Sequence, residues 1–297
     1  MKKSFKNPIY QGADPFILLY ENKYYAYTSG GDDGNKVMIS DNLIDWEDKG
    51  FCLKKEDVIG NYWFWAPEVI YRNGMFYMAF TAERHLGIAV SESPLGPFVQ
   101  KEKKWCVPHQ AIDGHFFVDD DGKVYLFYAA VSVIDGIEAN RIYGAEMNEQ
   151  MTEIKADTEK LIILPELPWE KMNDGTHGVE GPFVLKHGSE YHISYSTNGF
   201  ESPDYCIGGA VSNSPLGEYK KYEKNPVLKR NEYVQGVGHH SFTTSKDGKE
   251  LICAYHIHNN KENVEPRLVC IDKAEFVDGV LKINGPTMEV QVFDDEK

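Results

Sequence analysis

The feature that most constrains the fold of this 297-residue chain is a β-hairpin pattern that occurs five times. Each copy joins two short apolar and aromatic runs across a polar turn, as in residues 16–20 and 24–28, which flank Glu21-Asn22-Lys23. Such runs are too short for helices, and their β-branched and aromatic residues favour strands. The other copies cover residues 69–80, 116–128, 183–195 and 241–255. The sequence therefore predicts an all-β protein with almost no helix.

The spacing of the copies predicts how the hairpins are assembled. They recur about every 56 residues, which is close to the unit length of propeller repeats. A further apolar strand follows each hairpin, and two of these strands lead into the near-identical segments 91–98 and 212–219. Four strands per unit and five units predict a five-bladed β-propeller, with residues 1–297 as a single domain and no accessory domain. A β-sandwich, or two smaller all-β domains, would not explain five similar units.

Charge and cysteine content limit the partners and the cellular location. The chain has 31 Lys and Arg against 46 Asp and Glu, and its net charge of −15 repels polyphosphates and anionic lipids. We therefore expect neither nucleic-acid nor membrane partners. The five cysteines are odd in number and lack CxxC spacing, which predicts reduced, mostly buried thiols. No apolar segment follows the basic N-terminus, so we expect a cytoplasmic protein, unless an export signal has been removed.

Acidic residues stand immediately before three of the five hairpins. Asp14, Asp113 and Glu180 occupy similar places in three repeats, and the leading ends of the innermost propeller strands meet at the central channel. Each acid taken alone is more simply explained as a turn cap or a solvated side chain. Their recurrence instead predicts a shared site, in which neighbouring carboxyls push their pKa values apart. One protonated and one ionised carboxyl are what glycoside hydrolysis requires.

Six phrases in register show that the chain resembles glycoside hydrolase family 43 over nearly its whole length. Any one phrase is weak evidence, but six in the same order are strong evidence. After Asp113 this chain has Gly114-His115 where the family usually has a pair of small residues, which changes the floor of the expected pocket. The phrases are Ala13-Asp14-Pro15-Phe16, Trp65-Ala66-Pro67-Glu68, Ile112-Asp113 with Phe117-Val118-Asp119-Asp120-Asp121-Gly122, Glu180-Gly181-Pro182, Gly238-His239-His240-Ser241-Phe242 and Arg267-Leu268-Val269-Cys270-Ile271-Asp272.

The resemblance implies an inverting enzyme acting mainly on polysaccharides that contain arabinose and xylose. It implies Asp14 as the general base, Glu180 as the general acid, and Asp113 as the residue that orients the acid and tunes its pKa. His239 is implied to reach into the channel, where it would help to hold a calcium or another ion; no organic cofactor is expected.

The resemblance also implies two substrate-binding residues. Trp65 would offer an aromatic face to a sugar, although most aromatic residues of this chain must belong to the core. Arg267 would point at the acid or a sugar hydroxyl, and the competing interpretation is a surface ion pair with Glu265. His240, His256 and His258 are expected to pack or to line the pocket rather than to bind zinc.

The most favoured function is the release of terminal α-L-arabinofuranosyl units from oligosaccharides by one-step inversion. A β-D-xylosidase or an endo-arabinanase of the same family is the nearest alternative, because one hydroxymethyl group or ring form decides the specificity. A carbohydrate-binding propeller without catalysis is a more remote alternative. The three acids argue against it, because a lectin has no need of a carboxyl with a raised pKa.

Overall fold

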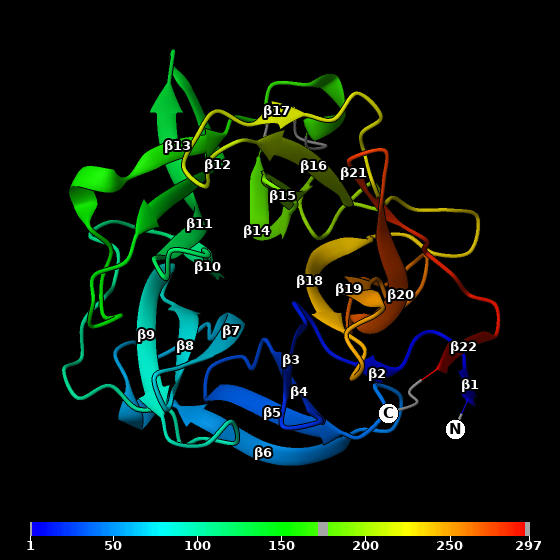
Figure 1. Cartoon of the computed structure of the whole chain (residues 1–297), viewed down its shortest axis with the longest axis horizontal. Coiled ribbons are helices and arrows are strands. Elements are labelled where there is room, and N and C mark those ends of the chain that lie inside the picture. The colour runs from blue at the N-terminus through cyan, green and yellow to red at the C-terminus, as the bar shows by residue number, and fades with distance from the viewer. Residues whose placement is uncertain (1, 172–177, 295–297) are drawn as a thin grey trace.

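The computed structural model describes residues 2–171 and 178–294, and shows five antiparallel sheets arranged around a central axis (Figure 1). Each sheet is one blade, and the innermost strands of neighbouring blades pack against each other around the axis. The predicted five-bladed β-propeller is therefore confirmed. In the described ranges the helical segments are three short 3-10 turns, η1 (Lys55–Asp57), η2 (Ala156–Thr158) and η3 (Pro168–Glu170). None of them is long or apolar enough to cross a membrane.

The blades follow one another along the chain. Blade 1 contains β3 (Phe16–Tyr20), β4 (Lys23–Thr28), β5 (Gly34–Ser40) and β6 (Glu47–Lys54), and blade 2 contains β7 (Trp65–Arg72), β8 (Met75–Ala82) and β9 (His85–Ser91). Blade 3 contains β10 (Ile112–Val118), β11 (Val124–Ile134), β12 (Ile137–Glu146) and β13 (Lys160–Ile163). Blade 4 contains β14 (Val179–His187), β15 (Glu190–Thr197), β16 (Cys206–Ser212) and β17 (Lys220–Lys221). Blade 5 contains β18 (Gly238–Thr244), β19 (Leu251–Ile257), β20 (Leu268–Val277) and β21 (Val280–Ile283).

The N-terminal part of the chain completes the last blade. β2 (Tyr10–Gln11) pairs antiparallel with β20, so blade 5 contains strands from both ends of the chain. Beside it, β1 (Lys2–Phe5) pairs with β22 (Gln291–Asp294). The first and last segments of the chain are thereby joined by hydrogen bonds, which prevents the ring from opening at its ends.

Blade 2 departs from the predicted four strands per unit. It has three strands, and the outer position is taken by a segment that makes an isolated bridge between Val90 and Val99. Pro94 and Pro97 flank the turn that leads into this segment. Because proline has no N–H to donate, a longer ladder cannot form there. The prediction of four strands is therefore wrong for this blade.

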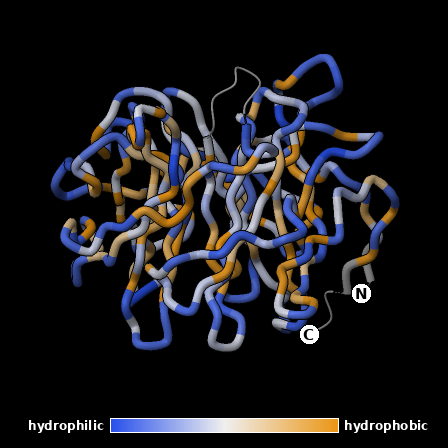
Figure 2. Tube along the Cα trace, turned by 90° about the horizontal axis from the view of Figure 1, so that it is seen from above, coloured by the Kyte–Doolittle hydropathy of each residue, from blue (hydrophilic) through white to orange (hydrophobic). Residues whose placement is uncertain are grey.

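The blades are held together by apolar side chains between the sheets. Tyr27, Phe64, Phe80 and Phe98 are fully buried in a core cluster that reaches from blade 1 into blades 2, 4 and 5. Apolar residues lie along the strands, whereas the loops at both faces are mainly hydrophilic (Figure 2). All five cysteines are buried and unpaired, which confirms the expectation from their spacing.

The inner strands are also linked by a repeated hydrogen bond, which we call the inter-blade clamp. At the start of each inner strand, one residue adopts a left-handed backbone, and its N–H donates to a side chain of the preceding blade. The left-handed residues are Asp14, Ala66, Asp113, Gly181 and His239, with φ of 52°, 40°, 59°, 52° and 44°. Their acceptors are His256 Nδ1 (3.2 Å), Ser29 Oγ (2.9 Å), Thr81 Oγ1 (3.1 Å), Asp113 Oδ2 (3.1 Å) and Ser196 Oγ (2.8 Å).

The strand register explains why the clamp recurs. Thr81, Ser196 and His256 face the residues just before the left-handed positions of their own blades, in each case at a register shift. In blade 3 the equivalent residue is Ala129, which has no polar side chain. There the carboxylate of Asp113 takes over the role and accepts the N–H of Gly181. The clamp thus runs through all five blades, and one of the candidate catalytic acids is part of it.

Replacing Thr81 with valine tests the clamp. Thr81 is fully buried, so Thr81→Val leaves the N–H of Asp113 without its acceptor while keeping nearly the same volume. Leaving a buried donor unpaired costs about 1–3 kcal/mol, and we expect the free energy of unfolding in urea to fall by that amount. Thr81→Ser keeps the hydroxyl and is the matched control. Equal stabilities of the valine and serine variants would show that the hydrogen bond contributes nothing.

Candidate functional site

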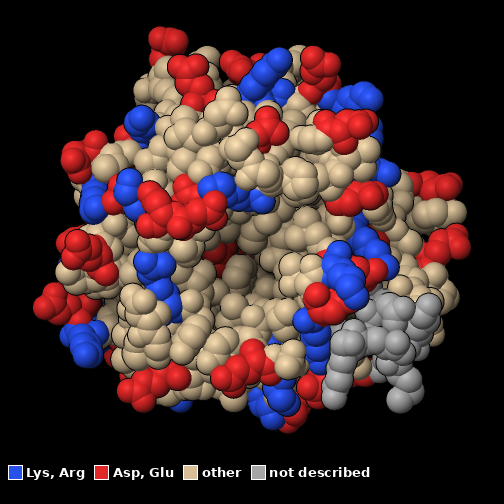
Figure 3. All heavy atoms as spheres, in the orientation of Figure 1, with Lys and Arg blue, Asp and Glu red and all other residues tan. Residues whose placement is uncertain are grey.

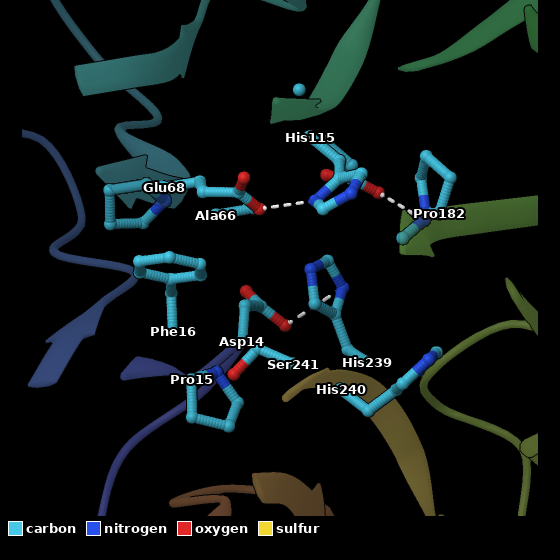
Figure 4. A pocket seen from close by; sticks show the side chains of 14 residues that line it. Asp14, Pro15, Phe16, Ala66, Glu68, His115, Pro182, His239, His240 and Ser241 are labelled. Atoms are coloured by element: carbon cyan, nitrogen blue, oxygen red, sulfur yellow. Dashed lines mark hydrogen bonds and ion pairs between the residues drawn. The ribbon is translucent and has the colours of Figure 1, made fainter. Parts of the chain in front are cut away.

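The five left-handed residues place a polar cavity on the propeller axis. The cavity is lined by the first residues of the inner strands of all five blades, including Asp14, Glu68, Asp113, His115 and His239 (Figure 4). In the surface view the molecule is hollowed at its centre, and acidic atoms lie at the bottom of the hollow (Figure 3). Because a left-handed residue turns the chain toward the axis, side chains far apart in sequence meet there.

The structure brings the three predicted acids together, but not at equivalent positions. Asp14 and Asp113 are both left-handed residues of the clamp, whereas the equivalent residue of blade 4 is Gly181. Glu180 lies one residue earlier and pairs with Ser196 at a register shift. The prediction of three equivalent positions is therefore wrong for Glu180: β10 and β14 have the same register shift, but Glu180 occupies the position of Ile112 rather than that of Asp113. All three carboxyls nevertheless act electrostatically on His239.

Asp14 is surrounded by cationic and hydrogen-bonding groups. Arg267 donates to its Oδ1 over 2.9 Å, Nδ1 of His239 lies 3.3 Å from the same oxygen, and the hydroxyl of Ser29 donates to Oδ2. Burial raises the pKa of Asp14, but the charges of Arg267 and His239 outweigh it. The pKa of Asp14 therefore lies well below its usual value, and this carboxyl is ionised at neutral pH.

Asp113 has the opposite tendency. Burial is the main cause that raises its pKa to about 7, and His239 opposes the shift. The charges of Glu180 and Asp14 raise it further, while the N–H of Gly181 stabilises the carboxylate. The pKa values of Asp14 and Asp113 are thus pushed apart, as the sequence predicted for neighbouring acids.

Glu180 is positioned by a tyrosine that the sequence analysis missed. The hydroxyl of Tyr205 donates to Oε1 of Glu180 over 2.7 Å, and burial together with the charge of Glu180 raises the pKa of Tyr205 far above its usual value. The tyrosine ring packs on the backbone of Gly238, where an added Cβ would lie 2.2 Å from the ring. Tyr205 lies in a loop outside the repeats, so only the glycine before His239 gave an indirect signal.

His239 lies among the three acids, as the resemblance implied. Burial lowers its pKa, but the carboxylates of Asp14, Asp113 and Glu180 more than offset this, and the net shift is upward. Calcium prefers six to eight oxygen ligands. In the described ranges no group of three or more His, Cys, Asp or Glu side chains is arranged to hold a metal. These side chains therefore do not form a calcium site by themselves, and the calcium prediction stays a prediction.

Arg267 contacts both Asp14 and Glu265, and its predicted role in substrate binding stays a prediction. Its Nη1 binds Asp14, as described above, and its Nε lies 3.0 Å from Oε1 of Glu265. The guanidinium also lies 4.6 Å from the centre of the Phe200 ring. Since Arg267 is mostly buried, these contacts fix its charge beside Asp14, which is the main reason that this carboxyl remains ionised.

A buried histidine connects three blades below the acids. Nδ1 of His115 lies 2.9 Å from Oε2 of Glu68, and its Nε2 accepts the N–H of Val184 over 2.9 Å. Because Nε2 accepts, the proton is on Nδ1 and is donated to Glu68. Glu68 also accepts the N–H of Phe116. The sequence marked Gly114-His115 as a departure from the family pattern, but the bridge to blades 2 and 4 was not foreseen.

The other expected residues lie around the cavity or beside it. Trp65 begins β7, half-buried, and its ring stacks on that of Trp63. His240, His256 and His258 are buried, which agrees with the expectation of packed side chains. Burial lowers the pKa of both His240 and His256 to about 3, so these two rings are neutral.

A family profile and a solved structure to which this chain is similar both carry the description of glycoside hydrolase family 43. The family profile described as "Glycosyl hydrolases family 43" matches residues 5–281. A solved structure entitled "Crystal structure of a thermostable family-43 glycoside hydrolase" is 42% identical, with a TM-score of 0.89 over 97% of this chain and 98% of that chain. An endo-1,4-beta-xylanase structure from Bacteroides thetaiotaomicron is 35% identical, with a TM-score of 0.88 over 96% of this chain and 98% of that chain.

A curated relative adds a second activity name. The extracellular exo-alpha-(1->5)-L-arabinofuranosidase of Streptomyces avermitilis is 28% identical over 282 residues, covering 87% of this chain and 57% of the relative. This chain therefore spans a little over half of that relative's length.

The raised pKa of Asp113 can be tested directly. The charge of Glu180 helps to raise it, so Glu180→Gln removes one upward contribution, and the pKa of Asp113 should fall below about 7. Carboxyl-carbon NMR titration of both proteins measures this change. Glu21→Gln removes an exposed carboxylate from the turn between β3 and β4, at the opposite end of β3 from Asp14, and is the matched control. An unchanged or higher pKa of Asp113 in Glu180→Gln would contradict the coupling between the two acids.

Proposed function

The chain belongs to glycoside hydrolase family 43, an inverting family of glycosidases, and from that premise we propose which bond it cleaves and which residues act. It is a glycosidase that acts on pentose-containing plant polysaccharides. We propose that it releases terminal α-L-arabinofuranosyl units from oligosaccharides of these polymers. The observation that carries the catalytic part is that Asp14, Asp113 and Glu180 all act on His239 beside the central cavity, with Asp14 held ionised.

Asp14 is the proposed general base. An inverting glycosidase needs an ionised carboxylate that takes a proton from the attacking water. Arg267 and His239 keep Asp14 in this form, and Ser29 fixes the orientation of the carboxylate by donating to its other oxygen.

Glu180 is the proposed general acid, and Asp113 is proposed to tune it. Tyr205 holds one oxygen of Glu180, which leaves the other oxygen for the glycosidic oxygen of the substrate. The charge of Glu180 helps to raise the pKa of Asp113, so the two carboxyls are electrostatically coupled. The hydrogen bond from Gly181, which directly follows Glu180, ties Asp113 to the backbone of the acid.

The arabinofuranosyl specificity is supported by the Streptomyces avermitilis relative, whose name states an exo-acting arabinofuranosidase. A β-D-xylosidase or an endo-acting enzyme is the alternative, and the xylanase title of the Bacteroides structure favours xylan-type substrates. These substrates differ by one hydroxymethyl group or by the ring form, so the shape of the loops around the site decides between them.

The substrate proposal is tested with p-nitrophenyl α-L-arabinofuranoside and p-nitrophenyl β-D-xyloside. We expect kcat/KM to be higher for the arabinofuranoside. A higher value for the xyloside would replace the proposed specificity with that of a xylosidase, and the absence of turnover on both would remove the assignment to terminal pentose units.

The two catalytic roles predict different responses to the leaving group. Asp14→Asn and Glu180→Gln should each lower kcat on a p-nitrophenyl substrate by about 10²–10⁴-fold, the usual contribution of acid–base catalysis. A 2,4-dinitrophenyl leaving group needs little protonation, so it should restore much of the activity of Glu180→Gln but not that of Asp14→Asn. Recovery of Asp14→Asn instead would exchange the two roles.

A further inference from the structure

Three aromatic residues before and at the start of β7 form an exposed ledge, which we define as Tyr62, Trp63 and Trp65. The rings of Trp63 and Trp65 are stacked, with centroids 5.2 Å apart and planes 15° apart. The ring of Tyr62 meets Trp63 edge-on at 4.9 Å. Trp63 is 44% exposed and Tyr62 is 43% exposed, which is unusual for large aromatic residues in a protein that buries most of its aromatic rings. The ledge therefore presents an indole face to solvent.

The backbone of the ledge holds this exposed ring in a strained conformation. Trp63 has a φ of 62°, in the left-handed region that bulky side chains rarely adopt. Its N–H donates to Oδ1 of Asp32 over 3.0 Å, and its neighbour Phe64 is bonded in both directions to the loop of Gly30 and Gly31. Strain that is fixed by neighbouring hydrogen bonds around a solvent-exposed ring points to a functional role for that ring.

The ledge is continuous with the site described above. Trp65 directly precedes Ala66, which is a left-handed residue of the clamp and lines the central cavity with Asp14 and Asp113. Trp65 also occupies the register position of blade 2 that Glu180 occupies in blade 4. A substrate with its scissile bond between Asp14 and Glu180 would therefore have Trp65 close by and Trp63 one ring further out.

We propose that Trp63 binds a pyranose unit on the leaving-group side of the scissile bond. This inference rests on the proposed function, and it names the substrate class as arabinofuranosyl units attached to a chain of xylopyranose type. A pyranose chair with equatorial hydroxyls has a flat face of C–H groups that packs on an indole, whereas a furanose ring is smaller and puckered. The carboxylate of Asp32, the amide of Asn61 and the carboxylate of Glu83 provide a polar edge for hydroxyl groups.

The test compares two substrates that release the same arabinofuranosyl unit, one from a pyranose chain and one from a furanose chain. We would measure kcat/KM for arabinofuranosyl-substituted xylotriose and for α-1,5-arabinotriose. In Trp63→Gly the ratio of the two values should fall about tenfold relative to wild type, mainly through KM of the xylotriose substrate. Trp63→Phe should restore part of the ratio. Phe51→Ala, which removes an exposed ring from the outer strand β6, should leave the ratio unchanged.

The glycine variant is chosen so that a loss of binding is not caused by unfolding. Glycine accepts a φ of 62° without strain, so Trp63→Gly should unfold at a temperature no more than a few degrees from wild type. A ratio in Trp63→Gly that equals the wild-type ratio would overturn the proposal.

A binding experiment separates this proposal from the proposed function. Xylotetraose should shift the tryptophan fluorescence of wild type, and Trp63→Gly should lose this shift, whether or not either protein cleaves an arabinofuranoside. No shift in wild type, or the same shift in Trp63→Gly, would overturn the pyranose site even if hydrolysis is observed. Failure of hydrolysis together with a Trp63-dependent shift would remove the proposed function and keep the binding site.

Discussion

The structure depends on the inter-blade clamp, in which a left-handed residue at the start of each inner strand donates its backbone N–H to a side chain of the preceding blade. Buried N–H groups need a partner, so these bonds set the angle at which each blade meets the next. Between blades 3 and 4 the acceptor is the carboxylate of Asp113, where the repeat has Ala129. The hydrogen bonds that close the ring of blades and those that position the site residues therefore belong to one network.

The same network determines the charges at the centre. Asp14 is bonded through its backbone to His256 of blade 5, and its carboxylate lies against Arg267 and His239 of the same blade. Asp113 lies deeper among carboxylates, so burial and repulsion raise its pKa to about 7. Two acids at equivalent backbone positions thus have pKa values shifted in opposite directions, because their neighbours differ. Such a difference allows one ring of side chains to provide both a base and a proton reservoir.

The sequence predicted the repeat architecture and the residues at its centre, because hairpin length, turn residues and spacing are local properties. It did not predict the one-residue offset of Glu180 or the left-handed backbone at Asp113, since the strand register that defines equivalent positions is not visible in the composition. Tyr205 was missed because it lies in a loop outside the repeats. Trp63 was missed because the chain has 18 Tyr, 15 Phe and 5 Trp, and only exposure distinguishes it.

The central claim is that Asp14 and Glu180 act in the same step on a single bond, with water attacking as the leaving group is protonated. Proton NMR of the sugar released in the first moments of the reaction tests this claim most directly. An α-L-arabinofuranoside should yield the β-anomer first, with the α-anomer appearing only through mutarotation. If the α-anomer appears first, the reaction proceeds through a covalent intermediate, and the assignment of Asp14 as a base acting on water is contradicted.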